Sequence, residues 1–125
     1  MIELEEVLEI HQVLINEFGG SQGVRDMGLL KSAIERPFSG FGATEFYSTP
    51  EEKASAILES IVKNHPFIDG NKRTGYVFMR LILMQYDKDI IATQDEKYTF
   101  IINIASGQAD FKDILWWIQA HLTDR

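Results

Sequence analysis

The stretch His65-Pro-Phe-Ile-Asp-Gly-Asn-Lys-Arg73 joins two apolar helical patterns through a turn that is rich in polar groups. Before it, Thr49-Pro-Glu-Glu has the composition of a helix start, and the helix is expected to continue to about Asn64. Pro66 lacks an amide donor and ends that helix. The next helix is predicted from about Asn71 to Tyr86, and it is apolar on nearly every side. A helix of that kind belongs in the middle of a bundle.

Four more helices are predicted outside this central pair. Apolar residues recur at helical spacing in residues 3–18, 26–35, 95–106 and 110–122. Gly19-Gly20 ends the first helix, and Asp26 is the N-cap expected for the second. Residues 87–93 are predicted to form a turn with a brief extended run. The expected fold class is therefore all-α: a bundle of about six helices with a central buried helix.

Residues 36–50 have a different composition, with two glycines, two prolines, four aromatic residues and no helical period. A loop of this length in a small domain is more often functional than idle. Two interpretations stay open at this point. The aromatic side chains cover a cleft or hold a peptide, or Phe38, Phe41 and Phe46 fold back into the core.

Composition limits the class of protein. A chain of 125 residues fits a single domain over 1–125, and the absence of cysteine excludes disulfides and cysteine-based zinc sites. A net charge of −7 disfavours binding to nucleic acid. The longest strongly apolar stretch, Tyr76 to Met84, contains Arg80 and is too short to span a bilayer. With no charged-then-apolar leader, we expect a cytoplasmic location and no membrane partner.

The central turn also gathers groups that suit phosphate chemistry. The start of a helix exposes unpaired amides and a partial positive charge, so it attracts anions. Gly70 permits close approach of the backbone to a ligand, while Lys72 and Arg73 add cationic donors. Asp69 is an oxygen ligand of the type that magnesium prefers, and His65 can accept a proton near neutral pH. These parts suffice for phosphoryl transfer.

Taken singly, each residue has an ordinary explanation. A lone histidine before proline is more often a hydrogen-bonding residue at a helix end than a catalyst. Asp-Gly-Asn is a common turn, and a Lys-Arg pair is usually solvated. Lys63 either reaches the same site or is simply solvated. His11, beside the apolar stripe of the first helix, is expected to be buried or half-buried with a hydrogen-bond partner rather than catalytic.

The ordered combination from His65 to Gly75 resembles the signature of the Fic/Doc superfamily, HPFx(D/E)GNxRxxR. Lys72 is similar to the Doc (death-on-curing) branch, whereas Fic proteins have glycine there. The stretch from Gly19 to Pro37 also resembles that branch, and the likeness spans about residues 10–85. Tyr76 departs from the signature, which ends in arginine at that position.

The resemblance implies the toxin of a toxin–antitoxin pair, a protein kinase that transfers the γ-phosphate of ATP to a threonine of elongation factor Tu. It implies that His65 takes the proton from the target hydroxyl and that Asp69 holds Mg²⁺. The residues that it implies for binding the ATP phosphates are Gly70, Asn71, Lys72 and Arg73. The 36–50 loop matches the position of the family's flap, which aligns the target peptide as an added strand.

Two alternatives remain open: a Fic-type AMP or other nucleotide transferase acting on a protein hydroxyl, and a catalytically idle peptide-binding module. Lys72 favours the kinase, because lysine fills part of the cradle in which Fic proteins hold a nucleotide phosphate. The inhibitory pattern (S/T)xxxE(G/N) of many Fic proteins is absent; Ser55 to Glu59 comes closest but is followed by Ser60. The resemblance therefore implies restraint by a separate antitoxin, whose C-terminal segment folds into a groove on the toxin.

Overall fold

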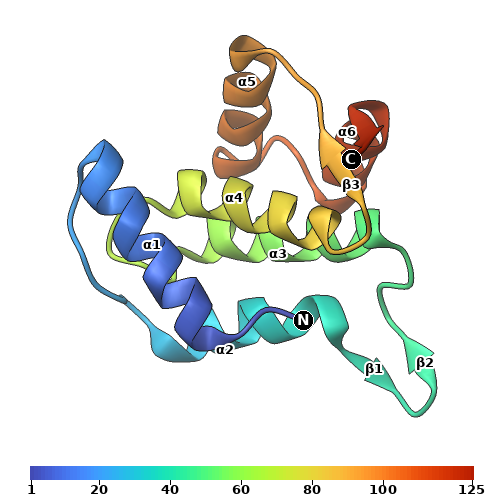
Figure 1. Ribbon diagram of the computed structural model, residues 1–125, viewed down its shortest axis with the longest axis horizontal. Coiled ribbons are helices and arrows are strands. Elements are labelled where there is room, and N and C mark those ends of the chain that lie inside the picture. Colours follow the sequence, from blue (N-terminus) through green and yellow to red (C-terminus); the bar gives the residue numbers. More distant parts are fainter.

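The computed structural model describes residues 1–125 as six α-helices with two small antiparallel sheets (Figure 1). This arrangement confirms the all-α bundle expected from the sequence. The helices are α1 (Leu4–Phe18), α2 (Met27–Glu35), α3 (Pro50–Asn64), α4 (Asn71–Met84), α5 (Gln94–Ala105) and α6 (Phe111–Ala120), with a 3₁₀ turn η1 at Arg36–Phe38. The strands are β1 (Gly40–Phe41), β2 (Thr44–Glu45), β3 (Lys88–Ile90) and β4 (Leu122–Asp124). No helix is long and apolar enough to cross a membrane.

Local sequence signals set the helix boundaries. The Asp26 side chain accepts a hydrogen bond from the Leu29 amide at the start of α2, as the sequence predicts. Thr49 and Glu52 form a reciprocal capping box before α3. The predicted helix starts are therefore confirmed to within one residue for both α2 and α3.

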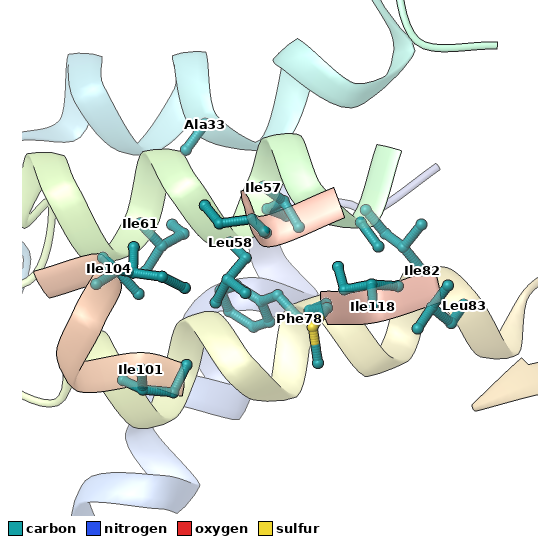
Figure 2. Packing of buried hydrophobic residues seen from close by; sticks show 14 of the residues in the cluster. Ala33, Ile57, Leu58, Ile61, Phe78, Ile82, Leu83, Ile101, Ile104 and Ile118 are labelled. Atoms are coloured by element: carbon teal, nitrogen blue, oxygen red, sulfur yellow. The ribbon is translucent and has the colours of Figure 1, made fainter. Parts of the chain in front are cut away.

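The hydrophobic core lies mainly between α3 and α4 and beneath α5 and α6. Figure 2 shows Leu58 and Ile61 of α3 among the side chains of Phe78 from α4 and Ile104 from α5. Gly75 lets the two central helices approach closely, since a Cβ atom there would lie 3.1 Å from Val62 Cγ2. This close contact fixes the position of the α4 start relative to the end of α3.

The helix at the centre of the bundle is α3, whereas the sequence singles out the 71–86 helix for that place. α3 packs against α2, η1, α4, α5 and α6. Its polar residues are buried because each is satisfied: Ser55 Oγ donates to the Glu51 carbonyl, and Ser60 Oγ accepts from Arg36. Lys53 is also buried, with its ammonium bound to Glu45 and to the Tyr47 carbonyl. Hydropathy alone therefore understates the burial of α3.

Residues 36–50 form η1 and the short β1–β2 hairpin. Phe38 packs against the core, but Phe41 and Phe46 are 82% and 60% exposed. The core interpretation is thus right for Phe38 and wrong for the other two. Figure 1 shows the hairpin projecting near the start of α3, while the turn between α3 and α4 lies at the other end of that helix.

The C-terminal third closes over the central pair. β3 pairs with β4, and Arg80 of α4 makes a two-pronged ion pair with Asp89 at 2.8 Å for both bonds. Of the two tryptophans, Trp117 stacks on Phe100 at the core while Trp116 is exposed. These contacts join β3 to α4 and α5 to α6.

Candidate active site

The turn that carries the signature begins at His65, which ends α3 in a left-handed conformation with φ of 51°. The last carbonyls of a helix lack partners within it. Arg25 provides partners for two of these carbonyls: its Nε donates to the His65 carbonyl and its Nη2 donates to the Asn64 carbonyl, both at 2.6 Å. No local pattern predicts this role for Arg25, although it lies in the Gly19–Pro37 stretch that carries the family resemblance.

A second segment holds the turn along its length. Val24 forms an antiparallel bridge with Phe67, and the amides of Arg25 and Asp26 both donate to the Pro66 carbonyl. The Ile68 amide donates to the Gly23 carbonyl at 3.1 Å. The connection between α1 and α2 therefore serves as a backbone template for the signature turn.

The inner side of the turn is anchored by Asn71 and His11. The buried Asn71 side chain accepts from the Phe67 amide and donates to the Phe67 carbonyl, each at 3.0 Å. His11 is buried, stacks on the Phe67 ring at 3.8 Å, and its Nε2–H donates to the Asp69 carbonyl at 2.8 Å. The predicted structural role of His11 is thus confirmed. Both ends of the Asn71 side-chain amide are thus bound to Phe67, while its main-chain amide lies in the first turn of α4, where helix amides lack partners within the helix.

Gly70 precedes α4 with φ of 75°, a backbone conformation that residues with a side chain rarely adopt. A Cβ atom at this position would lie 2.9 Å from Ile15 Cδ1 of α1. The backbone conformation and the packing of α1 therefore both favour glycine here. Gly70 is the N-cap of α4, so the first amides of the helix, which lack partners within it, follow directly.

A pocket of about 690 Å³ lies between this turn and α5. All six residues that the sequence analysis assigns to the site line it. The motif side contributes His65, Asp69, Gly70, Asn71, Lys72 and Arg73, and the α5 side contributes Gln94, Lys97, Tyr98, Ile101 and Ile102. His65 and the start of α4 therefore face one cavity, which packed side chains leave open.

The α5 wall was missed in the sequence analysis, because nothing in the local sequence shows which helix lies opposite the motif. None of residues 36–50 lines the pocket, so the β1–β2 hairpin does not cover it in this structure. Lys63 is not among the lining residues either. It is exposed and makes an ion pair with Glu59 on α3 at 3.4 Å, which favours a solvated surface residue over one that reaches the site.

The electrostatics of the pocket are positive. Lys72 and Arg73 are exposed and make no ion pair, although the chain carries 19 acidic residues. The Arg73 guanidinium lies over the Phe18 ring, 4.1 Å from its centroid, and this contact orients a donor that is otherwise free. The pocket thus offers helix amides and free cations to an anion.

Asp69 is the only carboxylate among the lining residues. Hydrogen bonds from the Ser21 and Gly70 amides, at 3.1 and 2.8 Å, lower the pKa of this carboxyl below its ordinary value. Each carboxylate oxygen keeps a lone pair for another partner. A single ionised carboxylate beside a phosphate site fits Mg²⁺, which proteins usually hold through one or two carboxylates together with substrate phosphates.

Acid titration provides a test of this environment. Because the folded-state pKa of Asp69 is depressed, its contribution to stability is present above the unfolded pKa of about 3.9 and is lost as pH falls through the lower folded value. We expect NMR titration of the side-chain carboxyl to give a midpoint below the ordinary value. A midpoint at or above that value would contradict the two amide bonds.

The Arg25 contacts lead to a second prediction. Replacing Arg25 with alanine removes both donors to the end of α3, and we expect a loss of about 1 kcal/mol in the free energy of unfolding. Replacement by lysine keeps the charge but not the two donors of the planar guanidinium, so it should restore little of the lost stability. Urea denaturation measures the change, with Lys31→Ala on α2 as the control, since Lys31 is exposed and makes no ion pair. Equal stability of the Arg25 and Lys31 variants would contradict this role.

Tyr76, the position at which the signature has arginine, also lines the pocket. Burial raises the pKa of its phenol to about 12, so the hydroxyl stays neutral. That hydroxyl is buried and has no hydrogen-bond partner within the protein. The turn of α4 beyond Arg73 therefore presents an uncharged ring to the pocket.

Comparison with known proteins agrees with this geometry. A sequence model of the Fic/DOC family matches residues 1–83. The chain is 39% identical over 75 residues to a protein named Toxin Doc from Mycolicibacterium smegmatis (strain ATCC 700084 / mc(2)155). The matched part is 60% of this chain and 55% of that relative, so the chain spans only about half of the relative's length.

Proposed function

Because this chain belongs to the Fic/DOC family, we propose that it is a phosphotransferase toxin that uses ATP and Mg²⁺ and modifies a hydroxyl group of a protein. One observation carries the proposal: His65 and the amino end of α4 line the same open pocket, together with two unpaired cations and one ionised carboxylate. Phosphoryl transfer requires mainly positioning and charge stabilisation, which these groups supply.

In the proposed reaction, the target hydroxyl attacks the γ-phosphorus of ATP while His65 takes its proton. The new bond joins the substrate oxygen to the γ-phosphorus, and the bond from that phosphorus to the bridging oxygen breaks, which releases ADP. Lys72, Arg73 and the first amides of α4 bind the phosphate oxygens and offset their negative charge. Bound Mg²⁺, held by Asp69, would neutralise further charge on the phosphates.

The similarity to a protein named Toxin Doc supports the assignment of a toxin whose activity is restrained by a separate antitoxin. The proposed substrate is a threonine of elongation factor Tu. Lys72 supports transfer of the γ-phosphate rather than of AMP, because a lysine, and not a glycine, lines the pocket at the start of α4. AMP transfer and an idle binding module are the outcomes against which this proposal is tested.

The test follows the label from ATP to the protein substrate. The purified chain is incubated with elongation factor Tu, Mg²⁺ and ATP labelled at either the γ- or the α-phosphorus. We expect label on the factor only from γ-labelled ATP, and no transfer when magnesium is chelated. Label from α-labelled ATP would replace the kinase with an AMP transferase. If neither form of ATP labels the factor and the chain does not bind ATP, the result would support a catalytically idle binding module instead.

A further inference from the structure

Lys97 of α5 is a third free cation on the pocket, on the wall opposite the signature turn. It is half-buried, it lines the same cavity as Lys72 and Arg73, and its Nζ lies 5.7 Å from the centroid of the Tyr76 ring. Lys97 makes neither an ion pair nor a side-chain hydrogen bond in the structure. By contrast, six of the twelve lysines and arginines are ion-paired.

The position of Lys97 is not explained by the stability of α5. It lies near the start of the helix, where the partial positive charge of the helix end disfavours a cation. Its neighbours at three and four positions along the helix are Thr93, Gln94, Phe100 and Ile101, none of which is acidic. The nearby Glu96 is bound to Thr93 and His121. Apart from its contact with the Tyr76 ring, the ammonium is therefore available to a partner from outside the chain.

We propose that Lys97 binds a phosphate group of the nucleotide from the α5 side, so that the polyphosphate lies between α4 and α5. This inference rests on the proposed function and adds to it a residue outside the segment 1–83 that the family model matches. Tyr76, which Lys97 overlies, is one helical turn beyond Arg73 and carries no charge. Lys97 is therefore the group that supplies positive charge at this second turn.

The location also decides which phosphate Lys97 meets. His65 precedes α4 and the phosphate-binding residues lie in its first turn, whereas Lys97 lies over Tyr76 in the second turn. A nucleotide whose γ-phosphate lies beside His65 would place its non-transferred phosphates nearer Lys97. Lys97 is then a binding residue whose loss raises KM for ATP while kcat changes little.

The experiment measures binding of MgATP and of inorganic pyrophosphate by calorimetry, and kinetics with the protein substrate. It compares the unaltered chain with Lys97→Met, Lys97→Arg and the control Lys112→Met, at a lysine on α6 that is exposed and outside the pocket. Methionine keeps most of the length of the unbranched side chain but removes the ammonium, including its contact with the Tyr76 ring. We expect Lys97→Met to weaken both ligands about tenfold or more, since a hydrogen bond to a charged group is lost. Lys97→Arg and Lys112→Met should stay within about threefold of the unaltered chain.

Each outcome has a defined meaning. Unchanged binding of both ligands by Lys97→Met would overturn the role of Lys97 and leave the proposed function standing. A fall in kcat with an unchanged KM would also overturn it. If the unaltered chain binds pyrophosphate through Lys97 but does not bind ATP, the anion site is supported and the kinase is not. If it binds neither ligand, both proposals fail.

Discussion

Replacing His65 with glycine is expected to lower the rate of phosphoryl transfer by about 10²- to 10⁴-fold while the fold remains intact. His65 is the only histidine among the residues that line the pocket, and histidine is the side chain that most often acts as a general base. Glycine adopts the left-handed conformation of position 65 without strain, and the bond from Arg25 ends on the main-chain carbonyl. The substitution thus removes the base without removing the contacts that shape the turn.

The measurement pairs single-turnover kinetics with thermal unfolding. His65→Asn is the matched variant, because asparagine also tolerates this backbone conformation but cannot act as the base. Both variants should lose activity equally and keep the melting temperature of the unaltered chain to within a few degrees. Retention of more than about a tenth of the activity by both variants would rule out His65 as the general base.

Replacing Asn71 with leucine is expected to lower the free energy of unfolding by about 2–4 kcal/mol. The Asn71 side chain satisfies both the amide and the carbonyl of buried Phe67. Leucine has a similar size and favours helices, but it leaves two buried polar groups without partners. Activity should fall as well, because the turn that carries His65 and Asp69 loses its inner anchor.

Chemical denaturation measures this effect against Asn103→Leu on α5. Asn103 is a half-buried helical residue whose side chain makes no hydrogen bond within the protein, so its replacement isolates the change of residue type. We expect the control to change the free energy of unfolding by no more than about 0.5 kcal/mol. Equal effects of the two substitutions would show that the Phe67 contacts do not stabilise the turn.

The helices could be predicted because their signals are local. Asp26 and Thr49 cap the helices that they precede, and the turn from His65 to Gly70 follows from Pro66 and from the glycine. The six assigned site residues lie together for the same reason, since they are neighbours in the sequence.

The parts that could not be predicted depend on contacts between distant segments. Arg25 reaches a helix end forty residues away in sequence, and no local pattern marks it as a cap. The same holds for Lys97, because the packing of α5 determines that it faces Lys72 and Arg73. The central position of α3 could not be predicted because Lys53 makes the helix look partly polar. Its burial depends on partners in and after the β1–β2 hairpin.

The placement of the aromatic residues in and around the β1–β2 hairpin could not be predicted from local patterns either. Its aromatic content indicates either a core or a binding role, and only the structure separates Phe38 at the core from Phe41 in solvent. The hairpin lies far from His65 because it adjoins the start of α3, whereas His65 follows the end of that helix. The fifteen residues of α3 correspond to a length of about 22 Å.

A crystal structure of the chain with Mg²⁺ and a non-hydrolysable ATP analogue would test directly whether the pocket binds the reacting phosphate. We expect the γ-phosphate to lie within hydrogen-bonding reach of both His65 and the first amides of α4, with the metal on Asp69. A nucleotide bound elsewhere, or one whose phosphates lie away from His65, would contradict this expectation.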